Sequence, residues 1–177
     1  MLAKSFHSVG LNEILTAVKV PKGSFYHYFE SKEQFGVELL KHYTQDHAVQ
    51  LKKVLLSKDL NPLERLLAYF NGAIARMMEC GCGNLCLVAK LGAEVATLSE
   101  PMRQVLADAM TEDRSLYEKV IRDGQEQGSI RKDLDPATAA AIVHDVWQGA
   151  MNRRQIERSV APLRTAADFI RSYLAAA

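Results

Sequence analysis

Two short helical patterns separated by a proline lie near the start of the chain and restrict its fold more than any other feature. In the first pattern, apolar residues recur three and four positions apart, at Leu11, Ile14, Leu15 and Val18. This spacing predicts a short helix with one buried face. Pro21 then suits the first turn of a second helix, where a missing backbone N–H costs no hydrogen bond. The sequence therefore predicts two short helices joined by a tight turn.

The second helix, predicted over residues 21–29, has an unusual outer surface. Phe25 and Phe29 lie four positions apart and are predicted to be buried together. The remaining side chains carry ammonium, hydroxyl and imidazole groups, at Lys22, Ser24, Tyr26, His27 and Tyr28. Such groups can reach phosphates and base edges in DNA. The pattern is typical of the second helix of a helix-turn-helix.

Residues 21–32 resemble the recognition helix and following turn of the TetR/AcrR-type transcriptional repressors. The resemblance implies DNA contacts in the groove or along the backbone from Lys22, Gly23, Ser24, Tyr26, His27 and Tyr28. It also implies a phosphate contact from Lys32. For His27 the alternative is a surface histidine without a DNA contact. The expected function is a repressor that a small ligand or a reactive electrophile releases from a palindromic operator.

The chain as a whole fits an all-α fold with two parts. Its 177 residues are 48% hydrophobic, which is enough for a buried core, and no sustained alternation of apolar and polar residues predicts a strand. The resemblance implies a helix-turn-helix module over residues 1–45. A helical bundle for ligand or redox sensing and dimerisation is expected over residues 46–177.

Charge and hydropathy add little to this assignment. The net charge is only +1, although residues 1–32 hold four lysines against two glutamates. No apolar run is long enough to cross a bilayer, and the start lacks a basic region followed by an apolar secretory segment. We therefore expect a cytoplasmic protein without membrane contact.

Two departures from the family pattern stand out. Only residues 1–4 can represent the last turn of the family's first helix, so the apolar sides of Ile14, Leu15 and Phe25 are expected to be incompletely covered. An alternative function follows from this departure: a dimeric ligand-binding module that has lost DNA binding. The second departure is Lys19, where the family usually has glycine in the turn. A left-handed backbone at Lys19 would be strained.

Start signals for further helices recur along the chain. Ser31 and Gln34 have the spacing of a capping box, and the helix that they start is predicted to reach about Leu56 and to link the DNA reader to the sensor. The other predicted starts are at Asn61-Pro62, Asn84, Ser99-Glu100-Pro101, Asp135-Pro136 and Pro162. The last two helices are rich in small and apolar residues around much of their circumference. They are predicted to form a homodimer interface.

Large apolar residues in the sensor have two interpretations. The residues concerned are Phe70, Ile74, Met77, Met78 and Trp147. In the simpler interpretation they fill the core. In the other they form the wall of a ligand pocket, to which the flexible methionines can adapt.

All three cysteines, Cys80, Cys82 and Cys86, lie within seven residues. A tetrahedral zinc site would need a fourth ligand, and no Cys or His follows Cys86 before His144, so we expect no metal. A structural disulfide does not suit a reducing compartment. Cys86 is either a small buried apolar residue or a reactive thiol. The first turn of a helix and Lys90 one turn later would favour its thiolate.

Residues 85–103 resemble the N-ethylmaleimide reductase repressor branch of the family. The resemblance implies that Cys86 senses electrophiles and oxidants, with Cys80 and Cys82 as potential resolving partners. An enzyme is not expected, because Cys86 has no His and acid partners at a recognisable spacing and no phosphate-binding loop occurs. No cofactor is expected either.

Overall fold

The computed structural model describes residue 6 and residues 9–79, 92, 94–95 and 97–176. The fold is all-α, as predicted. Its helices are α1 (Leu11–Ala17), α2 (Lys22–Tyr28), α3 (Lys32–Leu55), α4 (Pro62–Glu79), α6 (Glu100–Gln127), α7 (Pro136–Glu157) and α8 (Ala161–Leu174). The helix expected from Asn84 and the three cysteines lie outside the described residues. In the described ranges no helix combines the length and the apolar character needed to cross a membrane.

Four of the predicted helix starts are confirmed by side-chain caps. In each case a side-chain oxygen accepts a hydrogen bond from the backbone N–H three residues later. The pairs are Ser31 with Gln34 at 3.1 Å, Asn61 with Glu64 at 3.0 Å, Ser99 with Met102 at 3.3 Å and Asp135 with Thr138 at 2.8 Å. These caps fix where α3, α4, α6 and α7 begin.

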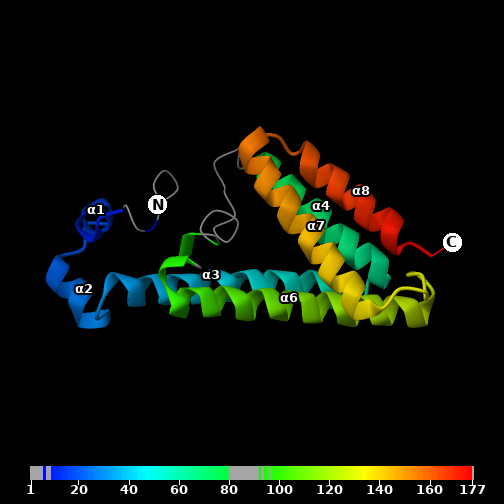
Figure 1. Ribbon diagram of the computed structural model, residues 1–177, viewed down its shortest axis with the longest axis horizontal. Helices are drawn as coiled ribbons and strands as arrows, with labels where there is room; N and C mark the ends of the chain where they lie inside the picture. Colours follow the sequence, from blue (N-terminus) through cyan, green and yellow to red (C-terminus); the bar gives the residue numbers. More distant parts are fainter. Residues whose placement is uncertain (1–5, 7–8, 80–91, 93, 96, 177) are drawn as a thin grey trace.

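Two long helices run side by side along the molecule. Figure 1 shows α3 and α6 along its length, α1 and α2 at one end, and α4, α7 and α8 packed together over the other end. Residue 45, the predicted domain boundary, lies inside α3. One continuous helix therefore connects the reader, α1 and α2, to the sensor.

The main core lies in the sensor, between α3, α4, α6, α7 and α8. Phe70 is fully buried, and its ring centroid lies 4.6 Å from that of Trp147. Ile74 is buried in the same core, and Met77 packs at its edge. Met78 is 55% exposed and accepts a hydrogen bond from Arg164 at its sulfur, at 3.5 Å. Core filling thus accounts for Phe70, Ile74 and Trp147 and in part for Met77. The role of the candidates as a pocket wall stays a prediction.

The outer face of α8 differs from expectation. Polar side chains are exposed along it, at Arg164, Thr165, Asp168, Arg171 and Ser172. The prediction that both final helices are apolar around much of their circumference is therefore wrong for α8, whose apolar residues lie mainly on its buried side. Its exposed apolar surface centres on Phe169, 46% exposed, whose ring stacks on Tyr173 at 5.7 Å.

A second, smaller core lies where the reader meets the sensor. It contains the buried side chains of Leu40, Val95, Met102 and Leu106, and Phe6 packs against it. Gly36 on α3 faces this core. A Cβ atom at Gly36 would lie 2.0 Å from the Met102 Cε atom and 2.6 Å from the Phe6 Cζ atom. Only glycine therefore allows this close approach.

We predict that Gly36→Ala destabilises the fold. The added methyl must displace packed side chains, which costs about 1–3 kcal/mol of unfolding free energy, measurable by urea denaturation. Gly23→Ala is the matched control, because a Cβ atom at Gly23 meets nothing within 4 Å. Unfolding of the Gly36→Ala protein at the same urea concentration as the native chain would contradict the packing described here.

Candidate nucleic-acid interface

The turn between α1 and α2 is tight and locally hydrogen-bonded. The backbone N–H of Val20 donates to the carbonyl of Leu15 at 2.9 Å, and that of Lys19 donates to Thr16 at 3.2 Å. Lys19 has a φ of 55°, in the left-handed region. The strain expected from a lysine at a glycine position is therefore present in the turn.

Aromatic packing anchors the second helix of the reader. The ring centroid of Phe25 lies 5.2 Å from that of Phe29 and 5.6 Å from that of Phe35 on α3. Phe29 and Phe35 are 5.2 Å apart in turn. Phe25 is buried as predicted, whereas Phe29 is only half-buried. The cluster fixes α2 on the start of α3.

The apolar residues of the reader are better covered than the sequence suggested. Leu15 is 6% exposed and Phe25 is 5% exposed, while Ile14 is half-buried. The expectation of incomplete cover is wrong for Leu15 and Phe25. For Phe25, part of this cover comes from Phe35 on α3, which the local pattern of the first two helices does not reveal.

The other residues of α2 point away from the protein. Exposed positions are Lys22, Gly23, Ser24, Tyr26, His27 and Tyr28, the predicted groove and backbone contacts. Tyr28 is 74% exposed, and the Lys22 ammonium lies 5.9 Å from the centroid of the Tyr26 ring. One short helix therefore presents a cation, several hydroxyls and an imidazole together. These groups can donate to phosphate oxygens and to acceptors on guanine.

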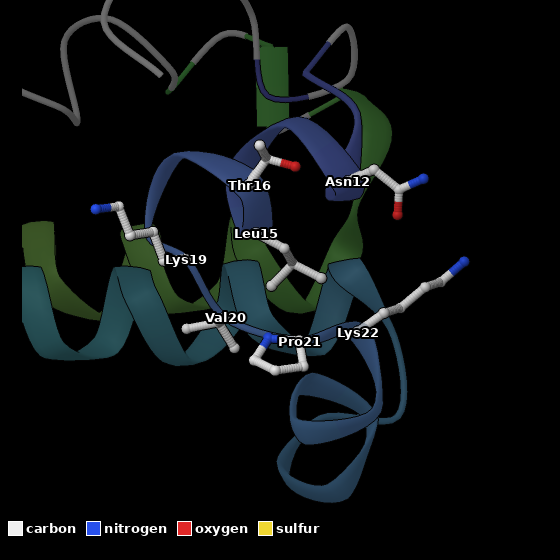
Figure 2. A pocket seen from close by; sticks show the side chains of 7 residues that line it. All are labelled: Asn12, Leu15, Thr16, Lys19, Val20, Pro21 and Lys22. Carbon is white, nitrogen blue, oxygen red and sulfur yellow. The ribbon is translucent and has the colours of Figure 1, made fainter.

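A groove of about 370 Å³ lies beside this helix, between α1 and the turn. It is lined by Asn12, Leu15, Thr16, Lys19, Val20, Pro21 and Lys22. Figure 2 shows the side chains of Lys19 and Lys22 extending to opposite sides, with Leu15, Val20 and Pro21 between them. The sequence reasoning did not include Asn12, Thr16 or Lys19 among the site residues. The signal in the sequence that could have identified them was their polar side chains on the exposed side of α1 and in the turn that follows it.

Lys32 is engaged within the protein. Its ammonium donates to the carbonyl oxygen of Phe6 at 2.5 Å and lies 4.7 Å from the centroid of the Phe6 ring. The backbone N–H of Phe6 donates in turn to Glu94 at 3.3 Å. Lys32 thus helps to hold the reader against the sensor, and its contact with a phosphate stays a prediction.

Known proteins match both parts of this architecture. Residues 1–39 match the bacterial regulatory proteins of the tetR family, and residues 62–170 match the tetracyclin repressor-like C-terminal domain. The chain belongs to the TetR family. It is a DNA-binding transcriptional regulator, as the exposed face of α2 indicates.

Its relatives in the TetR family carry names of repressors and regulators, not of enzymes. The chain is 35% identical to the transcriptional repressor NemR of Escherichia coli K12, over 98% of this chain and 87% of the relative. It is 36% identical to the repressor DhaR of Mycobacterium sp. strain GP1, over 92% of this chain and 80% of the relative.

Solved structures of TetR-family proteins have the same fold. The reduced form of E. coli NemR superposes with a TM-score of 0.93 at 34% identity, covering 99% of this chain and 91% of that one. A regulatory protein TetR from Rhodobacter sphaeroides gives a TM-score of 0.89 at 33% identity, covering 96% of this chain and 89% of that one.

We predict that Lys19→Gly stabilises this TetR-family reader. Glycine adopts the left-handed conformation without the steric cost, and its larger unfolded-state entropy offsets part of the gain. The net rise in unfolding free energy is expected to be up to about 1 kcal/mol, measured by urea denaturation without DNA. Lys19→Ala is the control, since it keeps the Cβ atom. A gain of equal size in the alanine variant would rule out relief of backbone strain as the cause.

Proposed function

We propose that this chain represses transcription as a homodimer on a palindromic operator, and that a small ligand or a reactive electrophile or oxidant releases it. The observation that carries the proposal is the exposed polar face of α2, held by the cluster of Phe25, Phe29 and Phe35. Similarity to repressors over nearly the whole chain supports it.

Each exposed group on α2 has a role that its chemistry supports. Lys22 suits donation to guanine O6 or N7, and Gly23 allows the backbone to come close to DNA. Tyr26 and Tyr28 suit phosphates, which position the protein without specifying a sequence. Lys22 is therefore the residue most suited to sequence discrimination.

Exposed apolar side chains support a dimer through α7 and α8. Phe169 on α8 is 46% exposed, and Ile156 near the end of α7 is 83% exposed. Burial of such residues against a second copy removes apolar surface from water. A two-fold dimer would present two copies of α2 to two half-sites, which matches a palindromic operator.

The alternative function, a dimeric ligand-binding module that has lost DNA binding, rests on the short stretch that precedes α1 and on the poor cover that it implies for the reader. Burial of Leu15 and Phe25 speaks against poor cover and so favours the repressor. A match of residues 1–39 to the family's DNA-binding part also favours the repressor.

Cys86 is the proposed sensor, on the basis of the sequence resemblance, and it lies outside the described residues. The solved structure of the E. coli relative is named as a reduced form. For release, the modified or ligand-bound chain must favour a state that fits the operator poorly, since equal affinity in both states shifts nothing.

We predict that Lys22→Ala weakens operator binding selectively. Loss of a base contact is expected to raise the dissociation constant roughly tenfold, with a smaller change on shuffled DNA. Fluorescence anisotropy with the DNA upstream of the chain's own coding sequence measures both. Lys53→Ala, which removes an exposed lysine from α3, is the control. Equal losses on the operator and on shuffled DNA would contradict base readout by Lys22.

We predict that Cys86→Ser abolishes release by electrophiles. The Cys86 thiolate would add to one carbon of the C=C bond of N-ethylmaleimide: a C–S bond forms, the C=C bond becomes a single bond, and the adjacent ring carbon takes up a proton. The adduct would lower operator affinity. Titration of the operator complex with N-ethylmaleimide measures the release, with Cys80→Ser and Cys82→Ser as controls. Undiminished release from the Cys86→Ser protein would remove Cys86 from the mechanism.

A further inference from the structure

A hydrogen bond between two side chains joins the start of α6 to the start of α3. The Ser99 hydroxyl donates to a carboxylate oxygen of Glu33 at 2.6 Å, across 66 positions of the sequence. Ser99 is the residue before α6, and Glu33 lies in the first turn of α3, close behind α2. Figure 1 shows both helices starting at the end of the molecule that carries α2. This hydrogen bond, called the tie below, therefore connects the sensor to the base of the reader.

The Ser99 hydroxyl serves both helices at once. Its oxygen also accepts a hydrogen bond from the Met102 backbone N–H at 3.3 Å, which caps α6. Ser99 is 8% exposed, while Glu33 lies at the surface, so the tie is partly shielded from water. A hydrogen bond to a carboxylate is roughly twice as strong as one between neutral groups. Because the same hydroxyl makes both contacts, the start of α6 cannot move away from α3 without breaking the tie.

A second polar connection lies next to the tie and passes through Phe6. The carbonyl of Phe6 accepts from the Lys32 ammonium, and its backbone N–H donates to Glu94. Lys32 and Glu33 are neighbours on α3, whereas Glu94 and Ser99 both precede α6. Two adjacent residues of α3 are thus connected to two positions of the stretch that leads into α6. A shift of this stretch acts on the base of the reader at both positions.

Polar pairs farther along the same two helices lie at the level of the sensor core. The His47 Nε2 atom lies 3.1 Å from a carboxylate oxygen of Asp113, and the Lys52 ammonium donates to Glu112 at 2.5 Å. Leu51, on the same part of α3, is buried in the main core. These contacts hold the sensor half of α3 on α6 even when the tie is broken. The tie therefore acts on the reader half of α3.

The contact between reader and sensor is loosely packed on the side of the tie. A hollow of about 290 Å³ lies between Lys32 and Glu33 of α3 and the residues Val95 and Ser99. Leu98, which also lines the hollow, is 57% exposed. Side chains separated by such a hollow make no close apolar contact across it. On this side the tie, and not apolar packing, resists a rotation of the reader.

We propose that the tie holds the reader in the orientation that fits the operator, and that its loss is the step by which the sensor releases DNA. Without the tie, the reader spends part of its time in orientations that fit poorly. The apparent affinity then falls in proportion to the fraction of molecules that still fits. Ser99 and Glu33 are thus positioning residues, which act without contacting DNA.

The two halves of the proposal have different requirements. Positioning of the reader requires only that the chain binds DNA. Loss of the tie as the step of release rests on the proposed function, in which Cys86 is modified. Along the chain, Ser99 stands between Cys86 and α6. A displacement that starts at Cys86 and travels along the chain therefore meets the tie before it meets α6.

Fluorescence anisotropy with the DNA upstream of the chain's own coding sequence tests the first half. In Ser99→Asp the new carboxylate still caps α6, but it cannot donate to Glu33 and repels it. The dissociation constant is expected to rise roughly tenfold. Glu33→Gln keeps an acceptor but removes its charge, so the dissociation constant is expected to rise only about threefold.

The double variant Ser99→Asp/Glu33→Gln distinguishes positioning from a purely structural role. The amide that Glu33→Gln introduces can donate to the carboxylate that Ser99→Asp introduces, which restores the tie with its hydrogen bond reversed. The dissociation constant is expected to return to within about threefold of the native value. Independent effects of the two substitutions would instead multiply to roughly thirtyfold.

Ser115→Asp is the matched control, because it adds the same charge at an exposed position of α6 and is expected to leave operator affinity unchanged. Circular dichroism melting shows whether each variant is folded. Hydrogen–deuterium exchange reads the tie without DNA: Ser99→Asp is expected to speed exchange in α2 but not in α4. Native affinity or native exchange in Ser99→Asp, an equal loss in Ser115→Asp, or no recovery in the double variant would overturn the tie as a positioning contact.

Titration of the operator complexes with N-ethylmaleimide tests the second half. The reagent is expected to lower operator affinity by a larger factor in the native chain than in Ser99→Asp, because that variant has already lost the tie. An equal factor in both chains would contradict loss of the tie as the step of release. A native chain that binds the operator but does not respond to the reagent would contradict the proposed release. The affinity and the exchange of Ser99→Asp would still decide whether the tie positions the reader.

Discussion

The packing of α3 against α6 determines how the two parts of the chain are joined. At one end, Gly36 lets Met102 of α6 and Phe6 approach the α3 backbone. At the other end, Leu51 and Leu55 of α3 enter the main core together with Tyr117 and other residues of α6. Because α3 is continuous, a shift of α6 against α3 in the sensor changes the support of the reader. The orientation of α2 therefore depends on contacts made far from it.

Much of the fold could be predicted because its signals are local. A cap such as Ser31 or Asp135 acts on a backbone N–H three residues later, so its partner is visible in the sequence. The strained turn at Lys19 was expected for the same reason, since its conformation depends on its own Cβ atom. The contact between Phe25 and Phe29 follows from helical spacing alone.

Residues whose partners are distant in the sequence were harder to assign. Lys32 was expected at a phosphate, but in the structure it contacts Phe6, which precedes it by 26 positions. The pair of His47 and Asp113 spans 66 positions, and no motif signals it. Met77 and Met78 are neighbours, yet one packs on the core and the other is exposed. Only the crossing of the helices decides these contacts.

The single tryptophan of the chain has a consequence for optical study. Trp147 is 7% exposed and packs on Phe70 within the main core. These residues belong to α7 and α4, which lie together with α8 over the end of the molecule away from α1 and α2 (Figure 1). The two tyrosines of α2 are the only fluorophores that the reader contributes among the described residues. Emission excited selectively through the indole ring therefore reports on the sensor core. The chain thus has a built-in spectroscopic probe of the sensor. A dye attached to α1 or α2 could follow the reader separately.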